Sequence, residues 1–354
     1  MVHSKNTHTI GVAMSVGVDS TVTAGLLLEQ GYPVHGFFML LPLPELEQQV
    51  SKVRLVAERL QIPLHLVDLR DRFKQSIISY FVDSYRQGVT PNPCVVCNRI
   101  IKCGQLLQEM TAQGMDKMAT GHYARIVREN GRPVLHRPVD PAKDQSYFLC
   151  RLSAEQLDRL ILPLGDWDKA AVFQRARQMG FSHFDGQESQ DVCFLTGQGL
   201  ATFLENQDVK SSPGEITTRD SRILGSHRGI WKYTVGQRRG LGLPDTTPWY
   251  VIGLDAAKNR VIVGKNEDLF LRDLQLRDVQ WAIQPPERWS GRVQLRSRHR
   301  AAEAQILPTN TANRQVHFEE PQRAITPGQF AVFYQDNRVV GSGIIDTPPS
   351  LCST

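Results

Sequence analysis

The sequence predicts an α/β protein of several domains, in which an N-terminal doubly wound parallel sheet precedes a small central domain and a C-terminal β-barrel-like domain. Up to about residue 180, short apolar runs alternate with amphipathic stretches, as in a parallel sheet covered by helices. After about residue 205, short segments bearing valine and arginine lie between Gly, Pro and Asn turns, as in antiparallel hairpins. The chain has 354 residues, more than a single domain usually contains.

The elements of the first half can be placed one by one. Short runs rich in apolar residues predict strands at residues 8–14, 33–40, 62–69 and 117–123. Between them apolar residues recur at intervals of three and four, which predicts helices at residues 20–31, 45–60, 73–88 and 97–110. Ligands of such sheets bind beyond the carboxyl ends of the strands. The loops that follow the predicted strands are therefore the candidate sites.

The second half is expected to be mostly β. Hairpins are predicted at residues 249–265, 291–307 and 329–345, where apolar segments flank turn residues. The sequences SSPGEI, at residues 211–216, and QPPERWSG, at residues 284–291, are typical of connections between domains. We therefore expect domain boundaries that give residues 1–208, 209–283 and 284–354.

The charge of the chain is unevenly distributed. The formal net charge is +5, and the basic excess is +4 from residue 205 onward against +1 before it. That second part contains 16 Arg and only 4 Lys. Because arginine suits planar recognition of phosphates and bases, the second half is the better candidate for an RNA-facing surface, although an ordinary solvated surface explains the charge equally well.

The sequence offers no sign of a membrane segment or a secretion signal. The first ten residues lack an apolar signal core, and no apolar run approaches the roughly 20 residues that cross a bilayer. Six cysteines in this length are too few for a disulfide scaffold. We expect a cytoplasmic protein with no membrane partner.

The first predicted strand leads into the first predicted helix through AMSVGVDST, residues 13–21. A tight turn before a helix presents unpaired backbone N–H groups and the positive end of the helix dipole, which suit a phosphate. Ser15 and Ser20 can add hydroxyl donors, and Asp19 could hold Mg²⁺. The lysine of the GxxxxGK[ST] loop is absent. The alternative is a strand-to-helix turn without a ligand.

Three cysteines crowd into TPNPCVVCNRIIKCG, residues 90–104. In a reducing compartment, such clusters usually indicate metal or redox chemistry. A structural zinc site needs four ligands, and neither a second CxxC nor a matching His pair is present. Cys97 lies at the predicted start of the helix at residues 97–110, where the helix dipole favours a thiolate. We expect Cys103 and Cys150 to be packing residues, and Cys352 to have no role.

The loop at residues 13–21 resembles the SGGxDS fingerprint of the PP-loop ATP pyrophosphatases, with Val16 in place of the first glycine. Further motifs follow in order: the cysteine segment, then TGHYAR at residues 120–125, KDQSYFL at 143–149, SQDVCFL at 189–195 and YTVGQRRGLGL at 233–243. Together they are similar to those of the tRNA-specific 2-thiouridylases, which replace the C2 oxygen of the wobble uridine with sulfur. The resemblance spans nearly the whole chain.

The resemblance implies a role for each domain and for each matching residue. Residues 1–208 would adenylate the carbonyl oxygen with ATP and transfer sulfur, residues 209–283 would connect, and residues 284–354 would contact tRNA. Cys193 would carry a persulfide, and Cys97 would attack it and leave a disulfide. The ATP site would comprise Ala13, Met14, Ser15, Val16, Gly17, Val18, Asp19, Ser20, Met39 and Gly121. The tRNA contacts would be Asn92, Pro93, Cys94, His122, Lys143, Asp144, Gln145, Arg298, His299 and Gln329.

Several points stay open at this stage. Cys94 stands where many relatives have an aspartate, so Cys94, Cys97 and Cys193 could instead hold a [4Fe–4S] cluster with one open iron. The source of sulfur could be a donor protein or sulfide. Without the family, His122 reads as a packed histidine and Met39 as core. The alternatives to the whole interpretation are a PP-loop amidating ligase of the argininosuccinate or GMP synthase type, and a tRNA-binding protein inactive toward ATP.

Overall fold

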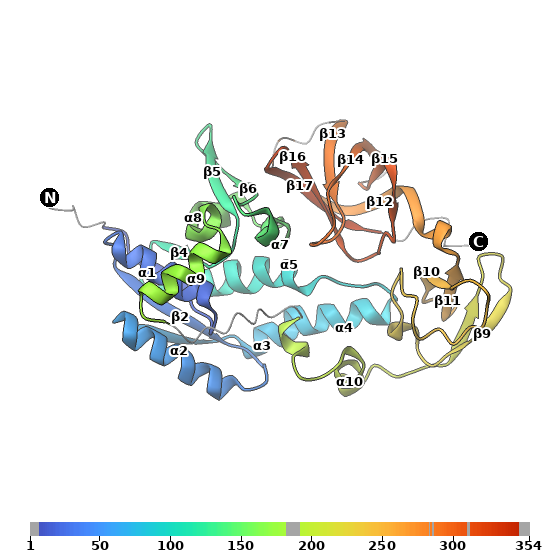
Figure 1. Cartoon of the computed structure of the whole chain (residues 1–354), viewed down its shortest axis with the longest axis horizontal. Coiled ribbons are helices and arrows are strands. Elements are labelled where there is room, and N and C mark those ends of the chain that lie inside the picture. The colour runs from blue at the N-terminus through green and yellow to red at the C-terminus, as the bar shows by residue number, and fades with distance from the viewer. Residues whose placement is uncertain (1–6, 182–191, 283, 285–286, 310–311, 347–354) are drawn as a thin grey trace. The chain divides into compact units, whose positions relative to one another are not determined.

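The computed structural model describes residues 7–181, 192–282, 284, 287–309 and 312–346 (Figure 1). The chain divides into two compact units. The first contains Met1–Ile77, Cys94–Gly197 and Asn337–Val339, and the second contains Ile78–Pro93, Gln198–Asp336 and Val340–Thr354. No helix among the described residues is both long enough and apolar enough to cross a membrane.

The first unit is built on a five-stranded sheet in the order β3-β2-β1-β4-β7, with every pair parallel. Its strands are β1 (Ile10–Ala13), β2 (Val34–Leu40), β3 (Leu64–Asp68), β4 (Lys117–Ala119) and β7 (Leu160–Ile161). The order grows from β1 toward β3 on one side and toward β4 on the other. The topological switch point therefore lies between β1 and β4, where sheets of this type bind their ligands.

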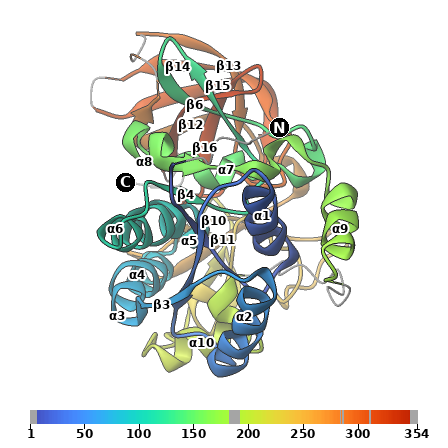
Figure 2. The same ribbon diagram turned by 90° about the vertical axis from the view of Figure 1, so that its left-hand side faces the viewer.

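Helices cover both faces of this sheet. On one face, α1 (Val18–Glu29) and α2 (Leu46–Leu60) pack on Ile10, Val12 and Phe38. On the other face, Met110 of α6 (Leu107–Ala112) packs so closely on Gly11 that a Cβ there would lie 2.9 Å from its sulfur. Figure 2 shows α1 and α2 on the side of the sheet opposite α6. The predicted doubly wound fold is confirmed, and all four predicted strands are present.

The remaining elements of this unit were not all predicted. They are α3 (Arg70–Phe73), the hairpin of β5 (Arg125–Glu129) and β6 (Arg132–His136), α7 (Ser146–Leu149), α8 (Ala154–Arg159) and α9 (Lys169–Gln178), together with short 3₁₀ turns at Pro141–Lys143, Pro163–Asp166 and Cys193–Leu195. Helix α9 lies against α1, where Val172 and Ala176 join Val22 and Leu26 in one buried cluster. This packing fixes the start of α9 beside the loop that precedes α1.

The cysteine segment departs from a regular α-helix. The backbone is helical from Pro93, as α5 (Pro93–Cys97), and continues as a π-helix (Asn98–Leu106) into α6. A π-helix leaves carbonyl groups without their usual partners. Here Gln156 Nε2 donates to the carbonyl oxygens of Arg99 and Cys103, at 2.8 Å each. A second π segment (Lys74–Ile78) joins α3 to α4 (Ser79–Arg86).

The start of this helix corrects one prediction. Cys97 was expected to begin a helix at residues 97–110, but it follows four helical residues and therefore lies inside a continuous helical segment. Proline suits the first turn of a helix because its missing N–H has no partner there. Pro93 thus moves the helix start upstream, and the helix-dipole argument for a Cys97 thiolate is wrong.

The second unit contains two β structures. After α10 (Leu200–Asn206), the strands β8 (Gly214–Thr217), β9 (Ile223–His227), β10 (Tyr250–Asp255) and β11 (Arg260–Gly264) form a sheet in the order β10-β11-β8-β9. It also carries two 3₁₀ turns, Ile230–Lys232 and Asn266–Leu269. Its core includes Ile216, Val251 and Val261. The predicted hairpin at residues 249–265 is confirmed as β10 and β11.

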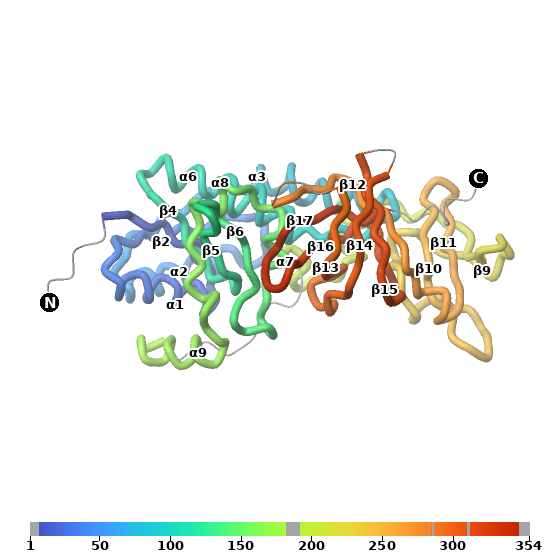
Figure 3. The backbone as a smooth tube through the Cα atoms, turned by 90° about the horizontal axis from the view of Figure 1, so that it is seen from above, coloured from blue at the N-terminus to red at the C-terminus, as the bar shows by residue number. Residues whose placement is uncertain are grey.

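The last six strands form a closed barrel. They are β12 (Phe270–Trp281), β13 (Trp289–Gln294), β14 (Ala302–Pro308), β15 (Arg314–Arg323), β16 (Phe330–Gln335) and β17 (Arg338–Ile345), in the order β12-β15-β14-β13-β16-β17. Pairing between β12 and β17 closes the barrel (Figure 3). Val293, Phe318 and Phe333 fill its core. The predicted hairpins at residues 291–307 and 329–345 are both confirmed.

Candidate active site

The loop between β1 and α1 lies at the switch point of the sheet. Two serines hold its shape: the Ser15 N–H donates to Ser20 Oγ at 3.0 Å, and the Gly17 N–H donates to Ser15 Oγ at 3.2 Å. Ser20 Oγ in turn lies 3.1 Å from the carbonyl oxygens of Ser15 and Gly17. Ser15 and Gly17 are exposed, whereas Ser20 is buried. The exposed part of the loop is thus backbone and a hydroxyl, which suit a phosphate.

Val16 does not strain this loop. It is not among the described non-glycine residues that have a positive φ. Gly17 is also extended, with φ −89° and ψ 156°. Because neither position needs the left-handed region, a valine can replace the first glycine of the fingerprint without a backbone penalty. Val16 therefore has an ordinary backbone conformation.

Gly121 lies against the loop, and Met39 lies at the same edge of the sheet. A Cβ added to Gly121, two residues after β4, would lie 2.8 Å from the backbone carbon of Asp19 and 3.0 Å from the Ser20 nitrogen. Met39 lies near the carboxyl end of β2, which pairs with β1, and its side chain is half-buried. The structure therefore places Gly121 against the loop and Met39 at the same edge of the sheet, and their contacts with ATP remain predictions.

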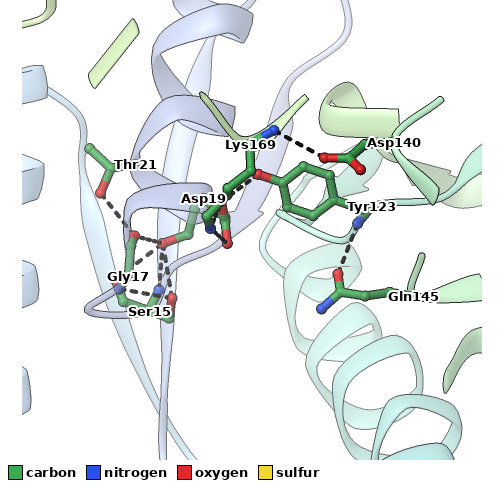
Figure 4. A network of polar contacts seen from close by, with 9 residues as sticks. Ser15, Gly17, Asp19, Thr21, Tyr123, Asp140, Gln145 and Lys169 are labelled. Carbon is green, nitrogen blue, oxygen red and sulfur yellow. Dashed lines mark hydrogen bonds and ion pairs between the residues drawn. The ribbon is translucent and has the colours of Figure 1, made fainter. Parts of the chain in front are cut away.

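A polar network at the loop includes residues that the sequence analysis missed (Figure 4). The Asp19 carboxylate accepts hydrogen bonds from Lys169 Nζ, at 2.8 and 2.9 Å, and from the Tyr123 hydroxyl at 2.8 Å. The Tyr123 N–H donates to Gln145 Oε1 at 2.8 Å. Lys169 is the first residue of α9, for which no helix was predicted. The signal in the sequence was Asp168, a helix N-cap residue whose carboxylate accepts from the Ala171 N–H at 2.7 Å.

The three candidate thiols belong to the same unit and are all free. Cys94 and Cys97 are half-buried on α5, and Cys193 is exposed at the start of a 3₁₀ turn. Phe194 holds this turn in place by an edge contact with Phe73, with ring centroids 5.8 Å apart. The Cys193 side chain is close enough for its charge to raise the pKa of both Cys94 and Cys97.

Burial and one lysine govern the ionisation of these thiols. Burial raises the pKa of Cys97 to about 12, and the nearby Lys102 ammonium opposes this by lowering it. The same two effects act in the same directions on the pKa of Cys94 and of Cys193. Lys102 is five residues after Cys97, which is the i to i+5 hydrogen-bond spacing of the π-helix between them. A 3.6-residue period places these two residues on different faces, so the sequence analysis missed Lys102.

His122 is a packed histidine. It is 9% exposed, and its Nδ1 lies 2.8 Å from Thr120 Oγ1. Burial, and to a lesser extent the Lys102 ammonium, lower the pKa of His122 to about 3, so the ring is neutral at physiological pH. Asp144 is also engaged within the chain, with Arg137 and with the Ser146 hydroxyl at 2.6 Å. Lys143 is half-buried in the adjoining 3₁₀ turn. Their predicted contacts with tRNA remain predictions.

In the second unit, two residues predicted to contact tRNA meet each other. Gln329 Nε2 donates to the carbonyl oxygens of Thr90 and Pro91, at 2.9 and 3.1 Å. The Asn92 amide lies 3.4 Å from Gln329 Oε1, and Pro93 follows directly. On the barrel, Arg298 is exposed and His299 is half-buried, and burial lowers the pKa of His299.

The proposed three-thiolate iron site finds no support. Across the described parts of the chain, which include Cys94, Cys97 and Cys193, no three His, Cys, Asp or Glu side chains lie close enough together to hold one metal ion. The three thiols therefore do not fit a cluster in the arrangement described. Cys103 is buried at 1% exposure, in agreement with a packing role, and Cys352 lies outside the described residues.

Three family models cover most of the chain. They are described as the tRNA methyl transferase HUP domain, which matches residues 8–197, the tRNA methyl transferase PRC-barrel domain, which matches residues 201–265, and the aminomethyltransferase beta-barrel domain, which matches residues 271–345. A solved 4-thiouridine synthetase with RNA and ATP covers 56% of this chain and 50% of its own, at 18% identity and a TM-score of 0.35. That score is too low to support an argument.

Curated relatives match over nearly their full lengths. A tRNA-specific 2-thiouridylase of Desulfotalea psychrophila is 47% identical, covering 95% of this chain and 98% of the relative. Its counterpart in Syntrophotalea carbinolica is 43% identical, covering 96% and 99%. The counterpart in Carboxydothermus hydrogenoformans is 41% identical, covering 95% and 96%. With this identity and coverage, the chain belongs to the family of tRNA-specific 2-thiouridylases.

Proposed function

We propose that this protein uses ATP to replace the C2 oxygen of the wobble uridine of tRNA with sulfur, which Cys193 and Cys97 deliver. The observation that carries the proposal is the placement in one unit of a phosphate-binding loop at the switch point and of free thiols under one shared positive charge. Neither an amidating ligase nor a passive RNA-binding protein needs this combination.

The loop supplies the adenylation step. The exposed Ser15 and Gly17 and the first turn of α1 offer hydroxyl and N–H donors to the phosphates of ATP. The Asp19 carboxylate is the candidate ligand for Mg²⁺, which would neutralise charge on the departing pyrophosphate. Adenylation is needed because the C2 oxygen of uracil is a poor leaving group. Once AMP is attached, that oxygen leaves with AMP when sulfur attacks the carbon.

The thiols supply the sulfur. A donor leaves a persulfide on Cys193, the exposed thiol, and its outer sulfur is then transferred. The Cys97 thiolate attacks the inner sulfur, a Cys97–Cys193 disulfide forms, and the outer sulfur leaves with the bonding electron pair and replaces AMP at C2. A dithiol reductant must then supply two electrons to restore the thiols. Burial keeps the pKa of Cys97 raised, to about 12, even beside Lys102, whose ammonium favours the thiolate.

The RNA contacts are proposed for the residues that match the family. They comprise Asn92, Pro93 and Cys94 near the base, His122, Lys143, Asp144 and Gln145 nearby, and Arg298, His299 and Gln329 in the second unit. Arg238 and Arg239 are exposed there as well, and arginine side chains suit contacts with phosphate.

The decisive experiment is mass spectrometry of tRNA nucleosides after reaction with ATP and a persulfide donor. Cys97→Ser and Cys193→Ser should each abolish 2-thiouridine while leaving ATP binding unchanged, and Cys150→Ser serves as the control. Iron-free protein should be fully active in this assay, and a strict need for iron would overturn the persulfide route. If the parent releases no AMP, the protein is a passive RNA-binding protein. AMP release with amide formation would instead identify a ligase.

A further inference from the structure

Cys94 is a third thiol, to which the proposed sulfur transfer gives no redox role. It lies three residues before Cys97 on α5, and the backbone is helical at both cysteines. Residues three apart in an α-helix lie on one face, with their Cα atoms roughly 5 Å apart. Disulfides join Cα atoms that are roughly 4.4–6.8 Å apart. Cys94 and Cys97 can therefore form a disulfide while the helix keeps its shape.

The three thiols share one environment. Cys94, Cys97 and Cys193 are free and belong to the same unit. Burial raises the pKa of all three, and the Lys102 ammonium opposes this in each case. Exchange between a thiol and a disulfide begins when a thiolate attacks one of the two bonded sulfurs. A disulfide that includes Cys97 would have Cys94 beside it on the same helix face.

Each proposed turnover ends with Cys193 unable to begin the next one. Cys193 is the exposed thiol of the three, and it would receive the persulfide sulfur from the donor. The transfer of sulfur leaves Cys193 bonded to the half-buried Cys97. Before another sulfur can be accepted, the bond between these two cysteines must break and Cys193 must become a thiol again.

We propose that Cys94 is a resolving thiol, which moves the disulfide from Cys97–Cys193 to Cys94–Cys97. The Cys94 thiolate attacks the Cys97 sulfur and forms the new S–S bond. The bond between Cys97 and Cys193 breaks, and its electron pair leaves with Cys193 as a thiolate. This exchange involves no net oxidation or reduction. Cys193 can then accept another sulfur, while an external dithiol supplies the two electrons that reduce Cys94–Cys97. This inference rests on the proposed function.

The test maps the disulfide that remains after one turnover. The full chain is loaded with sulfur from glutathione persulfide, separated from it, mixed with ATP and unmodified tRNA without a reductant, and trapped with excess N-ethylmaleimide. Trypsin cleaves after Lys and Arg, so Cys94 and Cys97 share the peptide of residues 87–99, whereas Cys193 lies in that of residues 178–210. Mass spectrometry therefore distinguishes a Cys94–Cys97 disulfide, within one peptide, from a Cys97–Cys193 disulfide, which links two peptides.

We expect most of the parent protein that has formed 2-thiouridine to carry the disulfide within one peptide, with Cys193 alkylated. Cys94→Ser should lose that disulfide and keep the link between the two peptides, whereas the control Cys150→Ser should match the parent. If Cys94→Ser does not fold, the map of the parent still decides the question. Formation of 2-thiouridine with only a Cys97–Cys193 or a Cys94–Cys193 link in the parent would overturn this inference alone. Absence of 2-thiouridine would overturn the proposed function as well.

Discussion

The contact between Gly121 and the start of α1 leads to a quantitative prediction. In Gly121→Ala, the added methyl group would lie 2.8 Å from two atoms of Asp19 and 3.0 Å from the Ser20 nitrogen. An ordinary contact begins at 3.4 Å, so the two segments must separate by at least about 0.6 Å. The nearest atoms include backbone of the first turn of α1, which cannot rotate away as a side-chain tip can. The substitution must therefore move the phosphate-binding turn.

The cost can be bounded from this geometry. Overpacking of this kind costs about 1–3 kcal/mol, and each kcal/mol lowers the melting temperature of a domain of this size by roughly 2–4 °C. If about 1.4 kcal/mol of the cost persists when ATP is bound, the affinity for ATP falls about tenfold. Differential scanning calorimetry and titration with ATP measure the two effects separately.

The matched control is Gly199→Ala. Gly199 is the N-cap of α10, with φ −67°, and a Cβ there would have no neighbour within 4 Å. Replacing glycine by alanine at an N-cap should cost roughly 0.5 to 1 kcal/mol, and it should leave the affinity for ATP unchanged. The reasoning would be refuted if Gly121→Ala melted at the parent temperature and bound ATP with parent affinity.

Three further predictions concern the thiols and the RNA surface. The rate of alkylation of Cys97 by iodoacetamide, measured by peptide mapping, should rise about tenfold per pH unit from pH 7 to 9 without a plateau. The reason is that the pKa of Cys97 is raised to about 12 and only the thiolate reacts. A plateau below pH 9 would contradict this. Lys102→Met should slow that alkylation and 2-thiouridine formation while Lys102→Arg retains both, and equal rates in all three proteins would remove Lys102 from the mechanism. Arg238→Ala and Arg239→Ala should each reduce the slope of log affinity for tRNA against log salt by roughly 0.7–0.9, and an unchanged slope would mean that neither side chain contacts a phosphate.

The sequence allowed the sheet and the hairpins to be predicted because their signals are local. A buried strand such as Ile10–Ala13 and a hairpin such as the one formed by β10 and β11 are apparent from a few neighbouring residues. The turn at the end of β1 was apparent for the same reason. The boundaries at residues 208 and 283 remain predictions, which limited proteolysis would test.

The geometry around Cys97 could not be predicted because it depends on a distant side chain. The π-helix requires a donor for the displaced carbonyl groups, and that donor is Gln156, more than fifty residues away. A 3.6-residue period therefore misplaced Lys102 relative to the thiols. The partners of Asp19 were missed for a similar reason: Tyr123 and Lys169 are 104 and 150 residues away along the chain.

The geometry of the folded loop changes the interpretation of Val16. Judged from the fingerprint alone, a valine in place of glycine raises doubt about ATP use. In the folded chain the turn is held by Ser15 and Ser20, and it requires no positive φ at Val16. Glycine is required instead at Gly121, because a side chain there would collide with the start of α1. Substituting Val16 by Gly should therefore leave the affinity for ATP within about twofold of the parent, and a gain of tenfold or more, measured by calorimetry, would show that the valine impairs the loop.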